Sequence, residues 1–210
     1  MFLKTILCLL INPFVIYAAT PINGLYTTGF GGLALLPGNM NFNNANVKIS
    51  NSDYNSGFNA GGAFGYKDSL WHYEGELSYI KAPLTSFNID NIKANNVDGY
   101  SQGLFGLANL YFDFPARMDS VLQAYIGAGI GGAWLQNSYS SIELSSNQIN
   151  NAAFAYQGTL GVNFNFSEAY TLSLYYRYLA TNQITAIGSI FQAHLINGGL
   201  SYRFDINEFK

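Results

Sequence analysis

The chain has 210 residues, of which 10% are charged, 16% are aromatic and 22 are glycine. Globular proteins carry about 25% charged residues, so this composition suits a protein whose outer surface does not face water. The formal net charge of −3 gives no support for the basic face that a nucleic-acid partner requires, and the single cysteine, Cys8, excludes a disulfide framework.

The first 19 residues have the pattern of a secretory signal peptide. Lys4 supplies the positive charge, residues 6–16 form the apolar segment, and Ala18 and Ala19 are the small residues where a peptidase would cut. No other segment offers eighteen uninterrupted apolar residues, as a transmembrane helix requires. We therefore expect a signal peptide over residues 1–19, and a membrane-spanning part made of strands that close on themselves.

Eight segments after the signal have the two-residue alternation of a β-strand. In residues 154–166 one parity is aromatic, aliphatic or glycine, and the other is small or carries amides. Residues 71–81 alternate in the same way, with Glu74 and Glu76 on the polar parity. The expected strands cover residues 25–35, 57–66, 71–81, 101–114, 121–135, 154–166, 170–178 and 196–204.

This sorting of side chains predicts an all-β fold, an eight-stranded antiparallel transmembrane β-barrel. Such a barrel turns its apolar parity to lipid and its polar parity to the lumen, whereas a soluble carrier of the lipocalin type has the opposite sidedness. Aromatics also gather near the two ends of the strands, as girdles at the membrane interfaces do. These interfacial aromatics are Trp71, Tyr79, Phe112, Phe114, Trp134, Phe154, Phe166, Tyr178 and Phe204.

The connections alternate in length, so every long one falls on the same rim. In a bacterial outer-membrane barrel the long loops lie outside the cell and both termini lie in the periplasm. Solvated external loops are the expected structure here, and Asp90, Asn95 and Asp98 lack the spacing of a calcium loop. The long connections cover residues 39–55, 82–99, 136–151 and 180–192, and the short ones cover residues 67–69, 115–120 and 167–169.

Five segments, 24–26, 109–114, 125–131, 154–157 and 199–204, resemble the small outer-membrane β-barrel family of opacity-type porins and surface antigens. This family is similar in architecture to the barrel domain of outer-membrane protein A. The resemblance covers residues 20–204 and implies a lumen plugged by an ion-pair network. It also implies recognition by the outer-membrane assembly machinery through Phe204, with residues 205–210 as a short periplasmic tail.

Four charged residues, Glu74, Glu76, Arg177 and Arg203, fall on the parity that faces the proposed lumen. Counted from the short turns, Glu76 and Arg177 lie at similar depth. An unpaired charge in a space poorly supplied with water is costly, so we expect partners for these groups. The hypothesis is that Glu76 and Arg177 form the central plug. An ion path is the functional alternative, although eight strands enclose a space that side chains fill.

Gly127, Gly129 and Gly132 match a dinucleotide-binding fingerprint, but Trp134 continues a strand where that motif requires a helix. We expect the inward glycines instead to leave room for large neighbours such as Tyr111.

The two histidines, His72 and His194, lack the supporting ligands of a metal site. A hydrolase arrangement of Ser189 and His194 with an acid is the sharpest enzymatic idea, and no motif supports it. No catalytic residue, metal or cofactor is therefore expected.

The sequence thus predicts an outer-membrane barrel with a structural or surface-interaction role, like that of a surface antigen or adhesin. Its expected partners are outer-membrane lipids and lipopolysaccharide, the assembly machinery, and a host or extracellular ligand bound by the long loops. The alternatives are a narrow, low-conductance porin and an outer-membrane enzyme that modifies lipids.

Overall fold

The computed structural model describes residues 23–37, 40–44, 47–89, 92–115, 121–141, 144–182 and 190–204. The expected signal peptide (1–19) and tail (205–210) lie outside these residues. Among the described residues, no helix is long and apolar enough to cross a membrane. The strands are β1 Gly24–Leu35, β2 Met40–Asn44, β3 Val47–Tyr54, β4 Gly57–Asp68, β5 Trp71–Ile89, β6 Ile92–Asp113, β7 Leu122–Ser141, β8 Leu144–Asn165, β9 Tyr170–Thr181 and β10 Gln192–Arg203.

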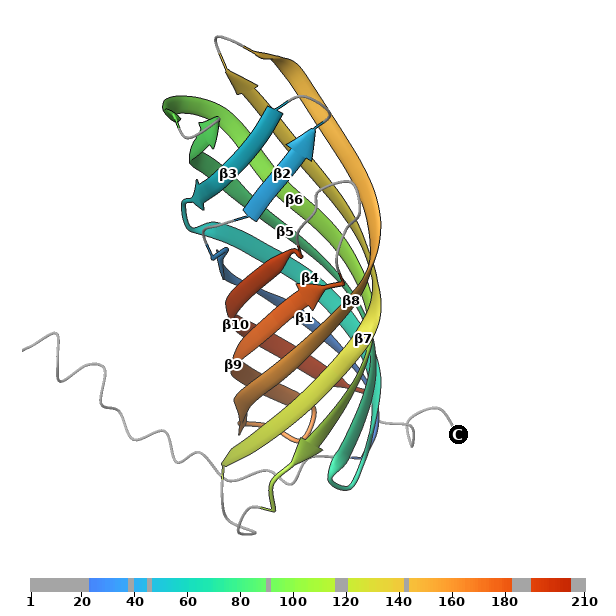
Figure 1. Cartoon of the computed structure of the whole chain (residues 1–210). Coiled ribbons are helices and arrows are strands. Elements are labelled where there is room, and N and C mark those ends of the chain that lie inside the picture. The colour runs from blue at the N-terminus through green and yellow to red at the C-terminus, as the bar shows by residue number, and fades with distance from the viewer. Residues whose placement is uncertain are drawn as a thin grey trace, which may run out of the picture.

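Eight of these strands close into an antiparallel barrel (Figure 1). Their order around the ring is β1, β4, β5, β6, β7, β8, β9 and β10, and the ring closes where β10 pairs with β1, from Tyr26↔Arg203 to Leu35↔His194. The predicted fold class and the number of barrel strands are confirmed.

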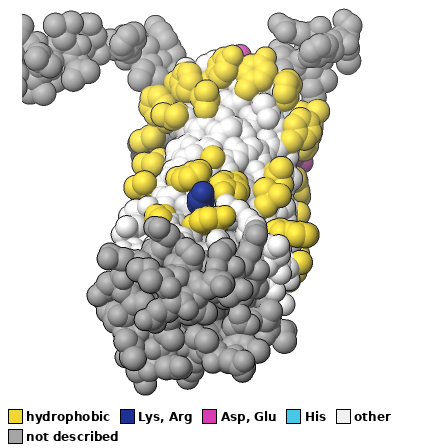
Figure 2. All heavy atoms as spheres, turned by 90° about the horizontal axis from the view of Figure 1, so that it is seen from above, with side chains coloured by type: hydrophobic (Ala, Val, Ile, Leu, Met, Phe, Trp, Pro, Cys, Tyr) yellow, Lys and Arg dark blue, Asp and Glu magenta, His cyan; other side chains and the backbone are white. Residues whose placement is uncertain are grey.

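Side chains of the barrel wall have the predicted sidedness. Leu160 on β8 and Leu174 on β9 are 56% and 61% exposed, whereas Glu76 and Arg177 are buried inside. Figure 2 shows hydrophobic side chains spread over the outer wall. This arrangement is the reverse of a soluble carrier and is that of a membrane barrel, whose outer wall contacts lipid.

The long connections differ from the expected loops. Strands β2 (Met40–Asn44) and β3 (Val47–Tyr54) pair with each other, and the pairs β5–β6 and β7–β8 continue to Ile89↔Ile92 and Ser141↔Leu144. The prediction of irregular loops was therefore wrong for most of residues 39–55, 82–99 and 136–151. Asn and Ser favour turns in isolation, but here each segment extends a strand pair that the barrel has already aligned.

These extensions form a raised sheet, which we define as β2, β3, residues 82–89 and 92–101, and residues 136–141 and 144–153. It stands above the rim on one side of the barrel, beyond the ends of β1, β9 and β10 (Figure 1). β3 joins it by pairing with β5 from Tyr54↔Leu84 to Ile49↔Ile89.

The interior has two layers. We expected a polar lumen throughout, but the buried charged side chains lie in the middle and near the short turns. The half near the raised sheet holds an apolar cluster, beside buried uncharged polar side chains such as Asn59 and Asn137. Side chains fill the narrow space inside an eight-stranded barrel, so inward positions can be apolar as in an ordinary core. The apolar layer consists of Ala34, Leu36, Ile80, Ala82, Phe105, Leu107, Ala133, Leu135, Ala155, Leu179, Phe191, Ala193 and Leu195.

Candidate functional site

A buried ion pair occupies the middle of the barrel. Arg177 Nη1 lies 2.6 Å from Glu76 Oε1, and both side chains are at most 2% exposed. The guanidinium also lies against the rings of Phe30 and Tyr175, at 5.0 and 5.2 Å from their centroids. The ion pair with Glu76 and the two ring contacts together hold the Arg177 side chain across the lumen.

Two amides complete this pair, and sequence reasoning did not single them out. Asn109 Nδ2 donates to Glu76 Oε2 at 2.8 Å, and Gln157 Nε2 donates to Asn109 Oδ1 at 2.7 Å and to Glu76 Oε2 at 3.2 Å. The signal was present, because both are inward amides on strands expected to line the lumen. The plug thus consists of Glu76, Arg177, Asn109 and Gln157, from β5, β9, β6 and β8.

Glu74 faces the lumen but does not share this plug. Tyr26 Oη donates to Glu74 Oε1 at 2.7 Å. The Tyr26 side chain reaches Glu74 across Gly65, where an added Cβ would lie 2.7 Å from Tyr26 Cζ and 2.8 Å from Glu74 Cγ. Gly65 is therefore required for this contact.

Arg203 also lies apart from the plug. Its guanidinium makes long hydrogen bonds of 3.4 Å to the Glu168 carbonyl and to Asn165 Oδ1. Within the part of the chain that the structure describes, it forms no ion pair. The four charges expected to form one network thus divide into one ion pair, one acid bound by a tyrosine, and one arginine near the short-turn rim.

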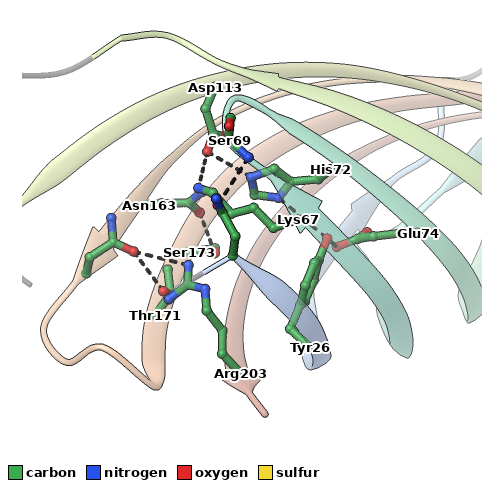
Figure 3. A network of polar contacts seen from close by, with 12 residues as sticks. Tyr26, Lys67, Ser69, His72, Glu74, Asp113, Asn163, Thr171, Ser173 and Arg203 are labelled. Atoms are coloured by element: carbon green, nitrogen blue, oxygen red, sulfur yellow. Dashed lines mark hydrogen bonds and ion pairs between the residues drawn. The ribbon is translucent and has the colours of Figure 1, made fainter. Parts of the chain in front are cut away.

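A second charged cluster lies at the short-turn end of the lumen. Asp113 Oδ2 is 2.6 Å from Lys67 Nζ and 2.8 Å from His72 Nε2, and the Asp113 side chain is fully buried. Figure 3 shows Lys67 and His72 converging on Asp113, with Tyr26 turned toward Glu74. Sequence reasoning missed this cluster because it placed Lys67 in a turn, whereas β4 continues to Asp68 and turns Lys67 inward opposite His72.

Between the plug and this rim lies a polar cavity of about 50 Å³. That volume holds a few water molecules and is far below the roughly 300 Å³ of a small-molecule site. The apolar layer lies on the other side of the plug, with Phe105, Leu135, Leu179 and Leu195 at most 1% exposed. The described part of the interior is therefore closed rather than an aqueous path.

The remaining expected residues are placed as follows. An added Cβ at Gly127 would lie 2.1 Å from Tyr111 Cδ1, so the expectation that this glycine makes room for Tyr111 is confirmed. His194 lies on the outer wall, 2.6 Å from Tyr176 Oη, and Ser189 is outside the described residues. In the described part of the chain, no three His, Cys, Asp or Glu side chains gather as a metal site requires.

The expected interfacial aromatics lie on the outer wall in two groups. Near the short turns, the Trp71 ring contacts Phe112, which contacts Phe114. In a second cluster at the same end, contacts run from Phe166 through Tyr170 and Tyr202 to Phe204. Near the raised sheet are Tyr79, Trp134, Phe154 and Tyr178.

Comparisons with known proteins agree with this architecture. The family model described as outer membrane protein beta-barrel domain matches residues 17–204. The chain is similar to Neisserial surface protein A, with 16% identity over 86% of this chain and 97% of that one, and a TM-score of 0.56. It is also similar to outer membrane protein OprG from Pseudomonas aeruginosa, with 14% identity over 88% and 98% of the two chains, and a TM-score of 0.52. No curated protein sequence matches the chain.

Proposed function

Because the chain belongs to the outer membrane protein β-barrel family, we propose that it is a bacterial surface protein whose raised sheet binds molecules outside the cell, as a surface antigen or adhesin does. The long hairpins face the exterior and both termini face the periplasm, the usual orientation of such barrels. The observation that carries this proposal is the raised sheet itself, which extends the barrel wall on one side above a closed interior.

The edges of the raised sheet suit a polypeptide ligand. β9 pairs with β8 only as far as Ala155↔Thr181, so among the described residues only β7 pairs with residues 144–153 of β8. Natural proteins usually protect such an edge with charged residues or proline, yet residues 144–153 contain neither. An extended segment of another protein can add to such an edge through backbone hydrogen bonds.

The closed interior supports a binding role over a porin. A transported solute would have to pass both the plug of Glu76 and Arg177 and the apolar layer beyond it. A catalytic role is also not proposed, because His72 lies inside the barrel near the short turns, whereas His194 lies on the outer wall near the raised sheet.

Shortening the hairpins tests this function. Residues 83–100 and 137–149 are each replaced by Asn-Gly, which joins the paired positions Ala82↔Ser101 and Gln136↔Asn150 through two-residue turns. Cells displaying the full chain should adhere to immobilised extracellular-matrix protein, and cells displaying the shortened chain should not. Equal adhesion by both variants, or by neither, would reject the proposal, with heat-modifiable gel migration as the control that both barrels are folded.

A further inference from the structure

We propose that Lys81, with the polar side chains beside it, binds a phosphate group of lipid A in the outer leaflet of the membrane. The inference rests on the proposed orientation, which puts the raised-sheet end of the barrel outside the cell.

Lys81 is an unusual residue on the outer wall. Of the lysine and arginine side chains that the structure describes, Lys67, Arg177 and Arg203 are buried inside the barrel, and Lys81 alone lies on the outside. Figure 2 shows a basic side chain surrounded by hydrophobic ones on the face in view. A lone ammonium beside an apolar surface requires an anion or water at its depth in the membrane.

The strand register fixes that depth. Lys81 on β5 is opposite Gln102 on β6, which is opposite Gln136 on β7. The next outward-facing row toward the short turns is Tyr79, Leu104 and Trp134. Lys81 therefore belongs to the first polar row above the apolar band, which is the level of lipid headgroups.

The neighbours of Lys81 hold donors in fixed positions. The Lys81 ammonium lies 4.5 Å from the centroid of the Tyr100 ring, which restrains it through a cation–π contact. Tyr79 Oη donates to Gln102 Oε1 at 2.7 Å, and Gln102 Nε2 donates to Gln136 Oε1. The row thus ends on the Gln136 amide nitrogen, a further hydrogen-bond donor.

This set of groups matches a phosphate. The row offers an ammonium group and amide N–H groups at the level of an anionic headgroup, and the aromatic and aliphatic side chains beneath them contact acyl chains. Lipid A supplies phosphates directly above acyl chains in the leaflet that the raised sheet faces.

The binding test uses the full chain refolded in dodecylmaltoside. The sequence has two tryptophans, Trp71 and Trp134, so W71F leaves Trp134, two residues from Gln136, as the fluorescent reporter. Lipid A should bind the W71F protein, and the added K81Q change should weaken binding about fivefold, as expected for one lysine at an anionic surface. K81R should bind like the parent, and K93Q is the matched control for loss of one charge.

Three results would overturn the inference: unchanged affinity in K81Q, an equal loss in K93Q, or equal binding of lipid A from which both phosphates have been removed. Equal binding of phosphatidylglycerol would overturn the choice of lipid A in favour of any anionic lipid. These measurements use detergent-solubilised protein without cells, so their outcome is separate from the adhesion test of the proposed function.

Discussion

Glu76 and Arg177 meet in the middle of the lumen although their strands are as far apart as the ring allows. β5 and β9 are separated by four steps in either direction around the barrel, and Arg177 Nη1 still reaches Glu76 Oε1 at 2.6 Å. The pair therefore braces opposite walls, and Asn109 and Gln157 connect it to the strands on one side.

Removing one member of this brace should destabilise the barrel strongly. R177A leaves the Glu76 carboxylate buried without its cation, and breaking a buried pair in this way costs about 3–5 kcal/mol. Urea unfolding in lipid vesicles, followed by the heat-modifiable gel band, measures the change. The double variant E76Q/R177M should recover part of the loss, since it buries no unpaired charge. If E76Q/R177M loses as much stability as the single variants E76Q and R177M lose together, the pairing is contradicted.

At the short-turn end of the lumen, Asp113 should contribute as much to the stability of the barrel as the pair of Glu76 and Arg177 does in the middle. D113A leaves Lys67 and His72 facing each other without the carboxylate that both contact. We expect a loss of about 3–5 kcal/mol in unfolding free energy. D68A at the end of β4, where Asp68 is exposed, is the matched control and should change stability little. Similar values for the two variants would show that the cluster contributes nothing.

The contact between Tyr26 and Glu74 depends on space at Gly65. G65A places a methyl group 2.7 Å from Tyr26 Cζ, so the tyrosine must move away and we expect a loss of about 1–3 kcal/mol. Gly106 faces outward, and an added Cβ there meets no atom within 4 Å, so G106A should be nearly neutral. Equal effects of the two substitutions in the same unfolding assay would disprove the steric argument.

The apolar layer should keep the barrel closed even without its plug. E76A/R177A removes the central charges but leaves Phe105, Leu135 and Leu195 in place. Planar-bilayer recordings should show no steady channels for the wild-type protein or for this variant. Steady conductance that appears only in E76A/R177A would mean that the ion pair alone closes the interior.

The sequence predicted the strands of the barrel well and those of the raised sheet poorly, for a physical reason. Lipid on one side and a packed interior on the other impose a strict two-residue alternation, as in residues 154–166, and this pattern is readable without a structure. In the raised sheet both faces of a strand can be polar, so residues 144–150 show no such alternation and read as loop. Their strand structure comes from alignment with β7, which is a property of the pair.

The candidate site was also predictable only in part: the pair of Glu76 and Arg177 could be predicted from the sequence, and the cluster around Asp113 could not. The inward positions of Glu76 and Arg177 follow from parity, and their common depth follows from the number of residues since the last short turn. The partners of Asp113 could not be found in this way, because Lys67 lies beyond the expected end of its strand. A strand end is set by the turn that follows it, here with Ser69 at a φ of 54°, and not by hydrophobic alternation.

Measuring which side of the outer membrane the raised sheet lies on tests the proposed surface role most directly. The cysteine of this chain, Cys8, lies in the expected signal peptide, so single cysteines introduced by N150C in the raised sheet and E168C in a short turn can be labelled selectively. We predict that a membrane-impermeant maleimide labels N150C on intact cells, and labels E168C only after the outer membrane is permeabilised. Labelling of E168C but not N150C on intact cells would place the raised sheet in the periplasm and contradict a role at the cell surface.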